Sequence, residues 1–449
     1  MVSLSSSICR FIAEAATAEH NSNIAHDKWD VDELHVSASL WYEDNALELE
    51  AFQHAVAAKN IEHAARLIHG NGMPLLFRGA GAVKPVIKWL NSLSREEMNT
   101  RPSLWVMFAS GLLMVGHMSE VEEKLQAAEQ SIQDALEDDE TRDLVGHIAA
   151  IRATLAVSKH QSEIILAESR LALENLAPGN LPVRTASTWA LGYAYHLQRN
   201  RTLASGAYSE ALSISQRIGH SVITIMATLG LGNLQEADNE LYVAAETYQN
   251  VLNLTGESPM PIACEAYLGL ARIYYEWNDL EAAKRHAERA LQLVKQFDHT
   301  DRVVACEIFL ARLMLVHGEE ERAAARLDKS EHFARQHQFV DQLPDIAAAR
   351  VMLLLRLGKL EEAALLAQKH ELPNSQARVF LAHGNPSAAL VVLGALREEA
   401  EIKGWKDECL KVMILQAVAQ HANGEKSKAI QQLQDVMILA EPGGFSGYL

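Results

Sequence analysis

The stretch LGYAYHLQRNRTLASGAYSEAL (Leu191–Leu212) consists of two short amphipathic runs with a polar segment between them. At the spacing of an α-helix, Leu191, Ala194 and Tyr195 share one face of the first run. One face of the second run carries Ala204, Tyr208, Ala211 and Leu212. The stretch therefore predicts a helical hairpin. A hairpin alone cannot bury its apolar face, so neighbouring hairpins are expected.

The hairpin recurs along the chain. An alanine equivalent to Ala204 returns at intervals of 40, 39, 40, 40, 26 and 40 residues, at Ala244, Ala283, Ala323, Ala363, Ala389 and Ala429. Five residues before each of these marker alanines lies a candidate turn residue: Arg199, Asn239, Asn278, Gly318, Gly358, Gly384 or Gly424. Six of the seven are Gly or Asn, which tolerate the left-handed backbone that joins two antiparallel helices.

This repeat predicts the fold class. We expect an all-α protein, a tetratricopeptide-like α-α superhelical solenoid with repeats of about 40 residues. No segment shows a strand period long enough to build a sheet. The interval of 26 predicts an irregularity near Leu366–Gln376, where Pro373 should end a helix.

The repeat also carries a family resemblance. The spacing of Leu191, Gly192, Tyr195, Ala204, Tyr208 and Ala211 resembles the tetratricopeptide pattern on a longer period. Three further segments resemble the sensor region of MalT-type transcriptional regulators: ELHVSASLWYEDNALELEAFQHAVAAKNIEHAARLI (Glu33–Ile68), FRGAGAVKPVIKWLNSLSREEMNTRPSLWVMFASGLLMVGH (Phe77–His117) and EPGGF (Glu441–Phe445). In that family the sensor lies between an N-terminal nucleotide-binding ATPase module and a C-terminal LuxR-type helix-turn-helix. The resemblance covers roughly Asp32–Phe445.

The resemblance implies a domain organisation. Residues 32–445 would form the sensor domain, residues 1–31 an N-terminal segment or helical cap, and residues 446–449 a truncated tail. The family's phosphate-binding loop, G-x-x-x-x-G-K-[ST], is absent, and the nearest glycine-rich text, GAGAVK (Gly79–Lys84), is predicted to be a turn. We therefore expect an excised sensor, or a regulator reduced to its sensor. No cofactor is expected in this chain, and ATP only where an ATPase module precedes it.

Composition favours a cytoplasmic interaction module. The 449 residues carry a formal charge of −18, which opposes binding to DNA phosphates, so we expect no direct DNA binding by this segment. The four cysteines form no C-x-x-C pair and fit a reducing compartment. The apolar stretch near the N-terminus is short and contains Arg10 and Glu14, so no membrane anchor is predicted.

The sequence gives no sign of catalysis. It has no H-E-x-x-H, G-x-S-x-G or G-x-G-x-x-G motif. Its 19 histidines include pairs such as His63 with His69, but that spacing does not put two imidazoles on one helix face. The acidic run Glu137–Glu140 is interpreted as solvated surface and not as a metal site. We expect neither an enzyme nor a metal-binding protein.

The predicted ligand site is the inner surface formed by the first helix of each hairpin. With Leu191 as position 7, positions 2, 5, 9, 12 and 13 should face this groove. The predicted ligand-binding residues are Trp189, Tyr193, His196, Asn233, Glu236, Arg272, Tyr275, Glu276 and Arg312. Aromatic rings mixed with planar hydrogen-bonding groups suit a polar organic ligand, a sugar or a peptide. Alternatively, Tyr193 and Tyr275 pack between repeats, and Arg272 with Glu276 is a surface pair.

Two hypotheses for function remain. In the first, the chain is the ligand- and partner-binding sensor module of a MalT-like transcriptional regulator. Its superhelical groove would bind a small effector, with sugars among the candidates, or a regulatory protein, and binding would promote self-association. In the second, the chain is a stand-alone tetratricopeptide adaptor for protein–protein interaction.

Overall fold

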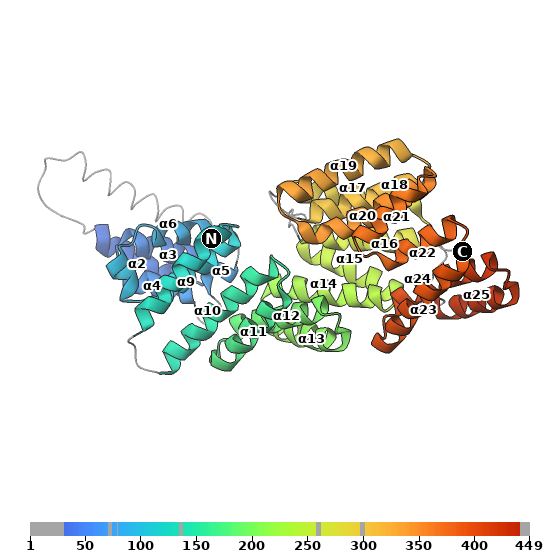
Figure 1. Cartoon of the computed structure of the whole chain (residues 1–449). Coiled ribbons are helices and arrows are strands. Elements are labelled where there is room, and N and C mark those ends of the chain that lie inside the picture. The colour runs from blue at the N-terminus through green and yellow to red at the C-terminus, as the bar shows by residue number, and fades with distance from the viewer. Residues whose placement is uncertain are drawn as a thin grey trace, which may run out of the picture. The chain divides into compact units, whose positions relative to one another are not determined.

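The computed structural model describes residues 31–70, 74–78, 80–133, 138–256, 262–296 and 301–440 (Figure 1). Within these ranges the chain forms 24 α-helices and one 3₁₀ turn, and no strand. This confirms the all-α prediction. The EPGGF segment, the predicted tail and residues 1–30 lie outside the described residues.

The chain divides into two compact units, and the boundary falls within α14 (Ser221–Ala237), between Thr224 and Ile225. The helices before α14 are α2 (Val31–Asp44), α3 (Glu48–Ala57), α4 (Ile61–His69), α5 (Leu75–Arg78), α6 (Ala80–Leu90), α7 (Arg95–Asn99), α8 (Pro102–Met114), α9 (Met118–Ile132), α10 (Asp139–Val157), α11 (Ser162–Asn175), α12 (Leu181–Leu197) and α13 (Arg201–Ile218). The elements after it are α15 (Leu241–Thr255), α16 (Ala263–Glu276), α17 (Leu280–Val294), α18 (Arg302–Val316), α19 (Glu320–Gln336), η1 (Val340–Gln342), α20 (Leu343–Arg356), α21 (Leu360–Lys369), α22 (Pro373–Ala382), α23 (Pro386–Lys403), α24 (Lys406–Ala422) and α25 (Lys426–Ala440).

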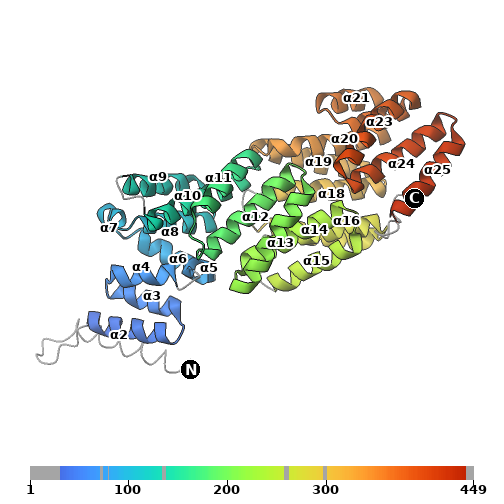
Figure 2. The same ribbon diagram turned by 90° about the horizontal axis from the view of Figure 1, so that it is seen from below.

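The stretch Leu191–Leu212 is the hairpin of α12 and α13, which lie side by side (Figure 2). Its turn residue, Arg199, has a φ of 57°. The N–H of Asn200 donates to the carbonyl of Tyr195 at 2.8 Å, which closes α12, and the Asn200 side chain accepts from the N–H of Leu203, which caps α13. All seven predicted turn residues have positive φ, between 57° and 85°. The predicted turns are confirmed.

The same turn also occurs earlier in the first unit, where the sequence markers did not detect it. Positive φ is found at Ala46, Lys59, Gly116 and His160. The residues five positions later are fully buried: Ala51, Ala64, Val121 and Ile165. The pattern was missed because three of these turn residues are neither Gly nor Asn, and two of the buried residues are larger than alanine.

The buried markers allow helices to cross closely. Ala204, Ala244, Ala283, Ala323, Ala363 and Ala389 have no exposed surface. Tyr248 of α15 is also fully buried, and its ring lies against Gly232 of α14 and Gly269 of α16. A Cβ added at Gly269 would lie 2.4 Å from that ring, so only glycine fits the crossing. In the first unit, a Cβ added at Gly192 would likewise lie 2.6 Å from the ring of Tyr208.

The structure confirms the predicted irregularity and corrects its cause. The two helices at this point, α21 and α22, have ten residues each. Pro373 does not end the earlier helix, because α21 already ends at Lys369 and the turn is made at Glu371, with a φ of 51°. Pro373 is instead the first residue of α22, where its missing N–H costs no hydrogen bond.

Two smaller points follow from the helix bounds. The glycine-rich text was predicted to be a turn, and this was wrong for Gly81–Lys84, which belongs to the start of α6. Gly79 lies outside the described residues. None of the helices that the structure describes is long and apolar enough to span a membrane.

The close crossing at Tyr248 gives a packing prediction. Gly269→Ala should destabilise the protein by ~1–3 kcal/mol, because its methyl group would overlap the buried ring. Gly394→Ala on exposed α23 is the matched control, since its Cβ would meet nothing within 4 Å. This control should stabilise the chain by ~0.5–1 kcal/mol through helix propensity. Thermal unfolding followed by circular dichroism measures both, and a Gly269→Ala variant that melts at or above the wild-type temperature would contradict the assigned packing.

Candidate functional site

A cavity of about 470 Å³ lies on the first helices of the hairpins in the second unit. Residues of α16, α18, α20, α22 and α24 line it, together with Gln342 from η1. Consecutive members of this series contact one another, so the cavity follows the stacking direction of the repeats. Its volume falls within the ~300–1,000 Å³ that is usual for ligand sites.

The lining follows the repeat numbering. Position 2 contributes Ala305, Asp345 and Lys411. Position 5 contributes Leu268, Ile308, Ala348 and Asn374. Position 9 contributes Arg272, Arg312, Met352 and Arg378. Three of the five positions predicted to face the groove therefore face one shared cavity. Among the nine predicted ligand-binding residues, Arg272 and Arg312 line it.

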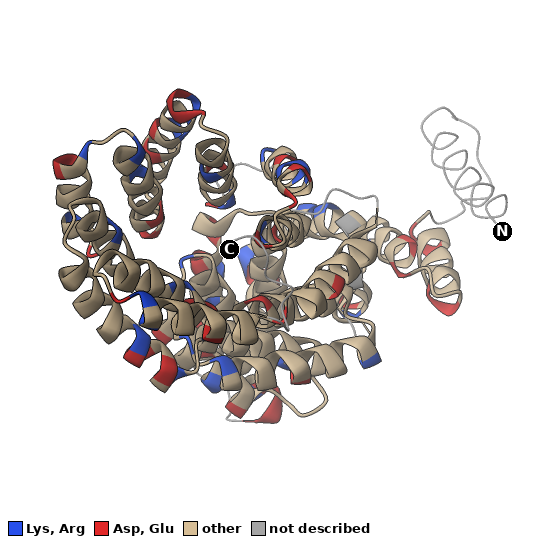
Figure 3. Cartoon of the chain, turned by 90° about the vertical axis from the view of Figure 1, so that its right-hand side faces the viewer, with Lys and Arg blue, Asp and Glu red and all other residues tan. Residues whose placement is uncertain are grey.

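The cavity combines cationic and apolar surface. Four basic residues line it, Arg272, Arg312, Arg378 and Lys411, against two acidic ones, Asp345 and Glu408. The chain as a whole has a formal charge of −18, and its charged residues of both signs are spread over many helices (Figure 3). Among the lining residues alone, positive charge is in excess, while Glu236 and Asp407 outside the lining pair with Arg272 and Lys411.

Arg312 is distinctive among these cations. It is half-buried and makes no hydrogen bond or ion pair with any residue that the structure describes. Lys411, in contrast, lies 3.5 Å from Asp407 and 3.7 Å from Glu408. Arg312 therefore presents a guanidinium with five N–H donors to the cavity.

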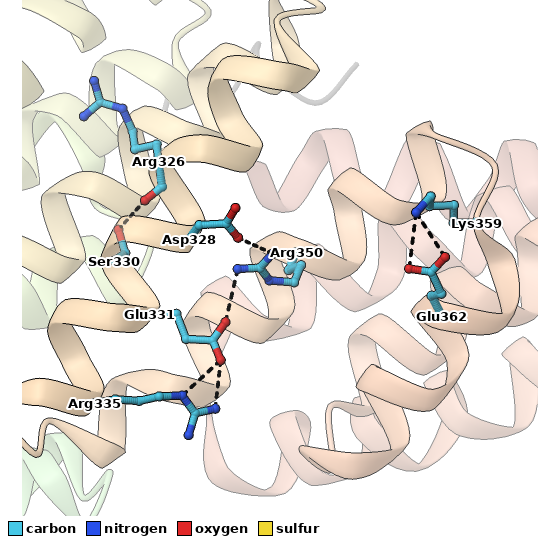
Figure 4. A network of polar contacts seen from close by, with 8 residues as sticks. All are labelled: Arg326, Asp328, Ser330, Glu331, Arg335, Arg350, Lys359 and Glu362. Carbon is cyan, nitrogen blue, oxygen red and sulfur yellow. Dashed lines mark hydrogen bonds and ion pairs between the residues drawn. The ribbon is translucent and has the colours of Figure 1, made fainter.

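Arg350 on α20 shows how an arginine between two helices finds its hydrogen-bond partners in this fold (Figure 4). It donates to Asp328 at 2.8 Å and to Glu331 at 3.1 Å, both on α19. A hydrogen bond from Arg335, and the charge of Arg350 after it, hold the pKa of Glu331 below its usual value. Arg350 thus fastens two neighbouring helices and does not line the cavity.

Arg272 is held in place by a partly buried network that is anchored on the buried Tyr248. Its Nε and Nη2 donate to the two carboxylate oxygens of Glu236, at 2.6 and 2.7 Å. The hydroxyl of Tyr248 lies 2.7 Å from both Glu236 Oε2 and Asn233 Oδ1, and it shares its single proton between them. Burial, and then the Glu236 carboxylate, raise the pKa of Tyr248 well above its ordinary value, so the hydroxyl remains a donor.

This network brings three predicted site residues, Asn233, Glu236 and Arg272, into one cluster. It also shows that Arg272 pairs across helices with Glu236. Tyr248 lies four residues after the marker Ala244, where the later repeats carry Ala or Leu and only the preceding repeat carries a tyrosine, Tyr208. A hydroxyl at such a buried position was the available signal for a role in a polar network.

The predicted aromatic residues are engaged with protein. On α12, Trp189 is 7% exposed and stacks on Tyr193 at 5.8 Å, and the Tyr193 hydroxyl lies 2.6 Å from His160 Nδ1. His196 lies edge-on to Tyr208 at 6.4 Å.

Tyr275 is oriented edge-on to Phe309 at 6.0 Å, and Phe309 lines the cavity. Neither Tyr275 nor Glu276 lines it. These contacts agree with the alternative that Tyr193 and Tyr275 pack against neighbouring protein side chains. A ligand-binding role for the nine residues stays a prediction.

Comparison with known proteins agrees with this architecture. The repeats define a tetratricopeptide-like α-α solenoid. The family model of the MalT-like TPR region matches residues 146–448, about two thirds of the chain, and the chain belongs to this family. The resembling segments Glu33–Ile68 and Phe77–His117 lie before the matched range, so their assignment stays a prediction.

Two solved structures have a similar fold. The Rap protein complexed with competence and sporulation factor gives a TM-score of 0.62 at 13% identity, and the match covers 76% of this chain and 98% of that chain. NprR in complex with its cognate peptide NprX gives a TM-score of 0.52 at 14% identity, covering 74% of this chain and 98% of that chain. At these identities the likeness concerns the fold.

The contribution of the Tyr248 network to stability can be tested by removing the tyrosine hydroxyl. Tyr248→Phe should lower the stability by ~1–3 kcal/mol, because Asn233 and Glu236 would lose a buried donor. Tyr242→Phe is the control, since this tyrosine is 57% exposed and its hydroxyl makes no hydrogen bond among the described residues. Thermal unfolding of both variants gives the comparison. Equal melting temperatures would mean that the network contributes nothing to stability.

Proposed function

We propose that the chain is a ligand- and partner-binding sensor module of a MalT-like regulator, and that its effector binds in the cavity lined by α16, α18, α20, α22 and α24. The observation that carries the proposal is that five successive hairpins contribute the same repeat positions to one cavity. Arg312, which has no hydrogen-bond or ion-pair partner among the described residues, lies within it. Where packing is the only role of such a region, buried polar groups are paired with other protein groups, and a cavity lined by an unpaired guanidinium is not expected.

The architecture supplies a way to respond to an effector. In a stack of repeats, each hairpin contacts chiefly its neighbours. An occupant that touches five hairpins at once would favour one arrangement of the stack over others by its differential affinity. Binding would thereby change which surfaces the module presents to a partner or to a second copy of itself, and self-association is the response that we propose.

The chemistry of the lining fits a binding role and not a catalytic one. The described residues of the cavity include one serine, Ser375, and neither histidine nor cysteine. We extend the proposal to a cytoplasmic location and to no direct binding of duplex DNA, for which the charge of −18 is the argument. The Rap and NprR structures were each solved with a peptide factor, so peptides belong among the candidate effectors, beside sugars and other small molecules.

A thermal-shift screen with a cavity-blocking variant tests the proposal. Sugars, amino acids, nucleotides and short peptides would be added to the wild-type chain. A ligand present at 100 times its Kd should add ~2.7 kcal/mol of stability, and so raise the melting temperature by several degrees. Ala348→Trp places an indole in the cavity and should abolish the shift. Ala325→Trp, on an exposed face of α19, should preserve it.

The same screen separates the alternatives. A ligand that shifts both tryptophan variants equally would place its site outside the cavity and contradict the proposal. A shift caused by long peptides alone, and by no small molecule, would favour the stand-alone adaptor hypothesis.

A further inference from the structure

We infer that the cavity selects an acidic peptide segment in extended conformation, and this inference rests on the proposed function. The first argument is charge. Arg312 lacks a protein partner among the described residues, and a half-buried guanidinium gains most from a carboxylate that can accept two of its N–H bonds. Arg272 pairs with Glu236 through its Nε and Nη2, and the N–H groups of its Nη1 can donate to a second acidic group on the ligand.

The second argument is that the site also offers acceptors and apolar surface. Asn374 Oδ1 is excluded from solvent and has no hydrogen-bond partner in the part of the chain that the structure describes. It needs an N–H or O–H donor from the ligand, which a fully ionised phosphate lacks and a peptide backbone supplies. Ile308, Phe309 and Met352 add apolar contacts for side chains. Anionic groups, backbone donors and apolar side chains occur together in an acidic peptide.

The third argument is spacing. Arg272 and Arg312 occupy the same position on α16 and α18, two first helices in contact. Packed helices lie ~8–10 Å apart, and an extended chain in the polyproline II conformation advances ~3.1 Å per residue with three residues per turn. Acidic residues three apart would therefore lie on one face of the peptide and meet successive arginines. Glu236 fixes the orientation of Arg272 in advance, which reduces the entropy lost on binding.

The probe is a labelled peptide, acetyl-EVTEVTE with tetramethylrhodamine, titrated against the full chain and followed by fluorescence anisotropy. The neutral peptide acetyl-QVTQVTQ is its control. We expect the acidic peptide to bind at least tenfold more tightly, with an affinity that falls as salt is added. Arg312→Gln should weaken binding of the acidic peptide about tenfold, and Arg312→Lys should restore part of the loss.

The matched control is Arg322→Gln, which removes the same charge from an exposed position on α19, outside the cavity. It should change the affinity by less than about twofold. Circular dichroism would verify folding, and Arg378→Gln provides a second cavity variant if Arg312→Gln fails to fold. Equal affinity for the acidic and neutral peptides, or equal effects of Arg312→Gln and Arg322→Gln, would overturn the inference.

Two further outcomes separate this inference from the proposed function. The first is a neutral ligand whose binding is abolished by Ala348→Trp and is unchanged by Arg312→Gln. This result would overturn the inference of an acidic peptide and would leave the cavity as the effector site. Binding of the acidic peptide that persists in Ala348→Trp would overturn both. Displacement of the peptide by an equal concentration of citrate would overturn the assignment to a peptide, because a free carboxylate would then suffice.

Discussion

The rest of the structure depends on how closely two helices of this chain can approach. A left-handed turn residue reverses the chain, and five residues later a fully buried side chain sets the crossing distance. Where that side chain is alanine, little side-chain volume separates the two helices. Tyr248 lies four residues after the marker Ala244, and its large ring fits because both adjacent helices carry a glycine against it, Gly232 and Gly269. Each first helix is thereby held against its neighbours in the stack.

Alignment of the first helices connects packing to the candidate site. Arg272 lies on the cavity side of α16, yet its orientation is fixed by Glu236 and, through it, by Tyr248 in the crossing. The residue that holds three helices together is therefore the residue that orients part of the lining. Within the part of the chain that the structure describes, Arg312 has no equivalent support, and its guanidinium can donate to a ligand. Arg272 and Arg312 thus occupy the same repeat position but differ in their surroundings, because only Arg272 has a carboxylate, that of Glu236, beside it.

Sequence periodicity predicted the fold well because the signal is local. Turn residues, marker alanines and the shortened interval each act within one hairpin. Even Arg199 could be assigned to a turn from its position, although its residue type argues against positive φ. The site was predicted less completely. Positions 2, 5 and 9 could be derived from the repeat, but pairing of Arg272 with Glu236 spans 36 residues and is invisible to an i, i+4 rule. The cavity residues of α20, α22 and α24 were likewise missed, since the candidates ended at Arg312.

The short repeat shows what kind of length change this architecture accepts. Between Ala363 and Ala389 the interval falls from 40 to 26, a loss of 14 residues, or about four turns at ~3.6 residues per turn. The loss falls at the end of α21, at the start of α22 and in the connection between them, which has no counterpart of η1. Residues removed at helix ends do not rotate the turns that remain, and Arg378 lines the cavity together with Arg312 and Met352. A deletion inside a helix would instead rotate the side chains that follow it in that helix by ~100° per residue. The connections between hairpins are therefore the places where this solenoid can change length, as the interval of 39 residues among those of 40 also indicates.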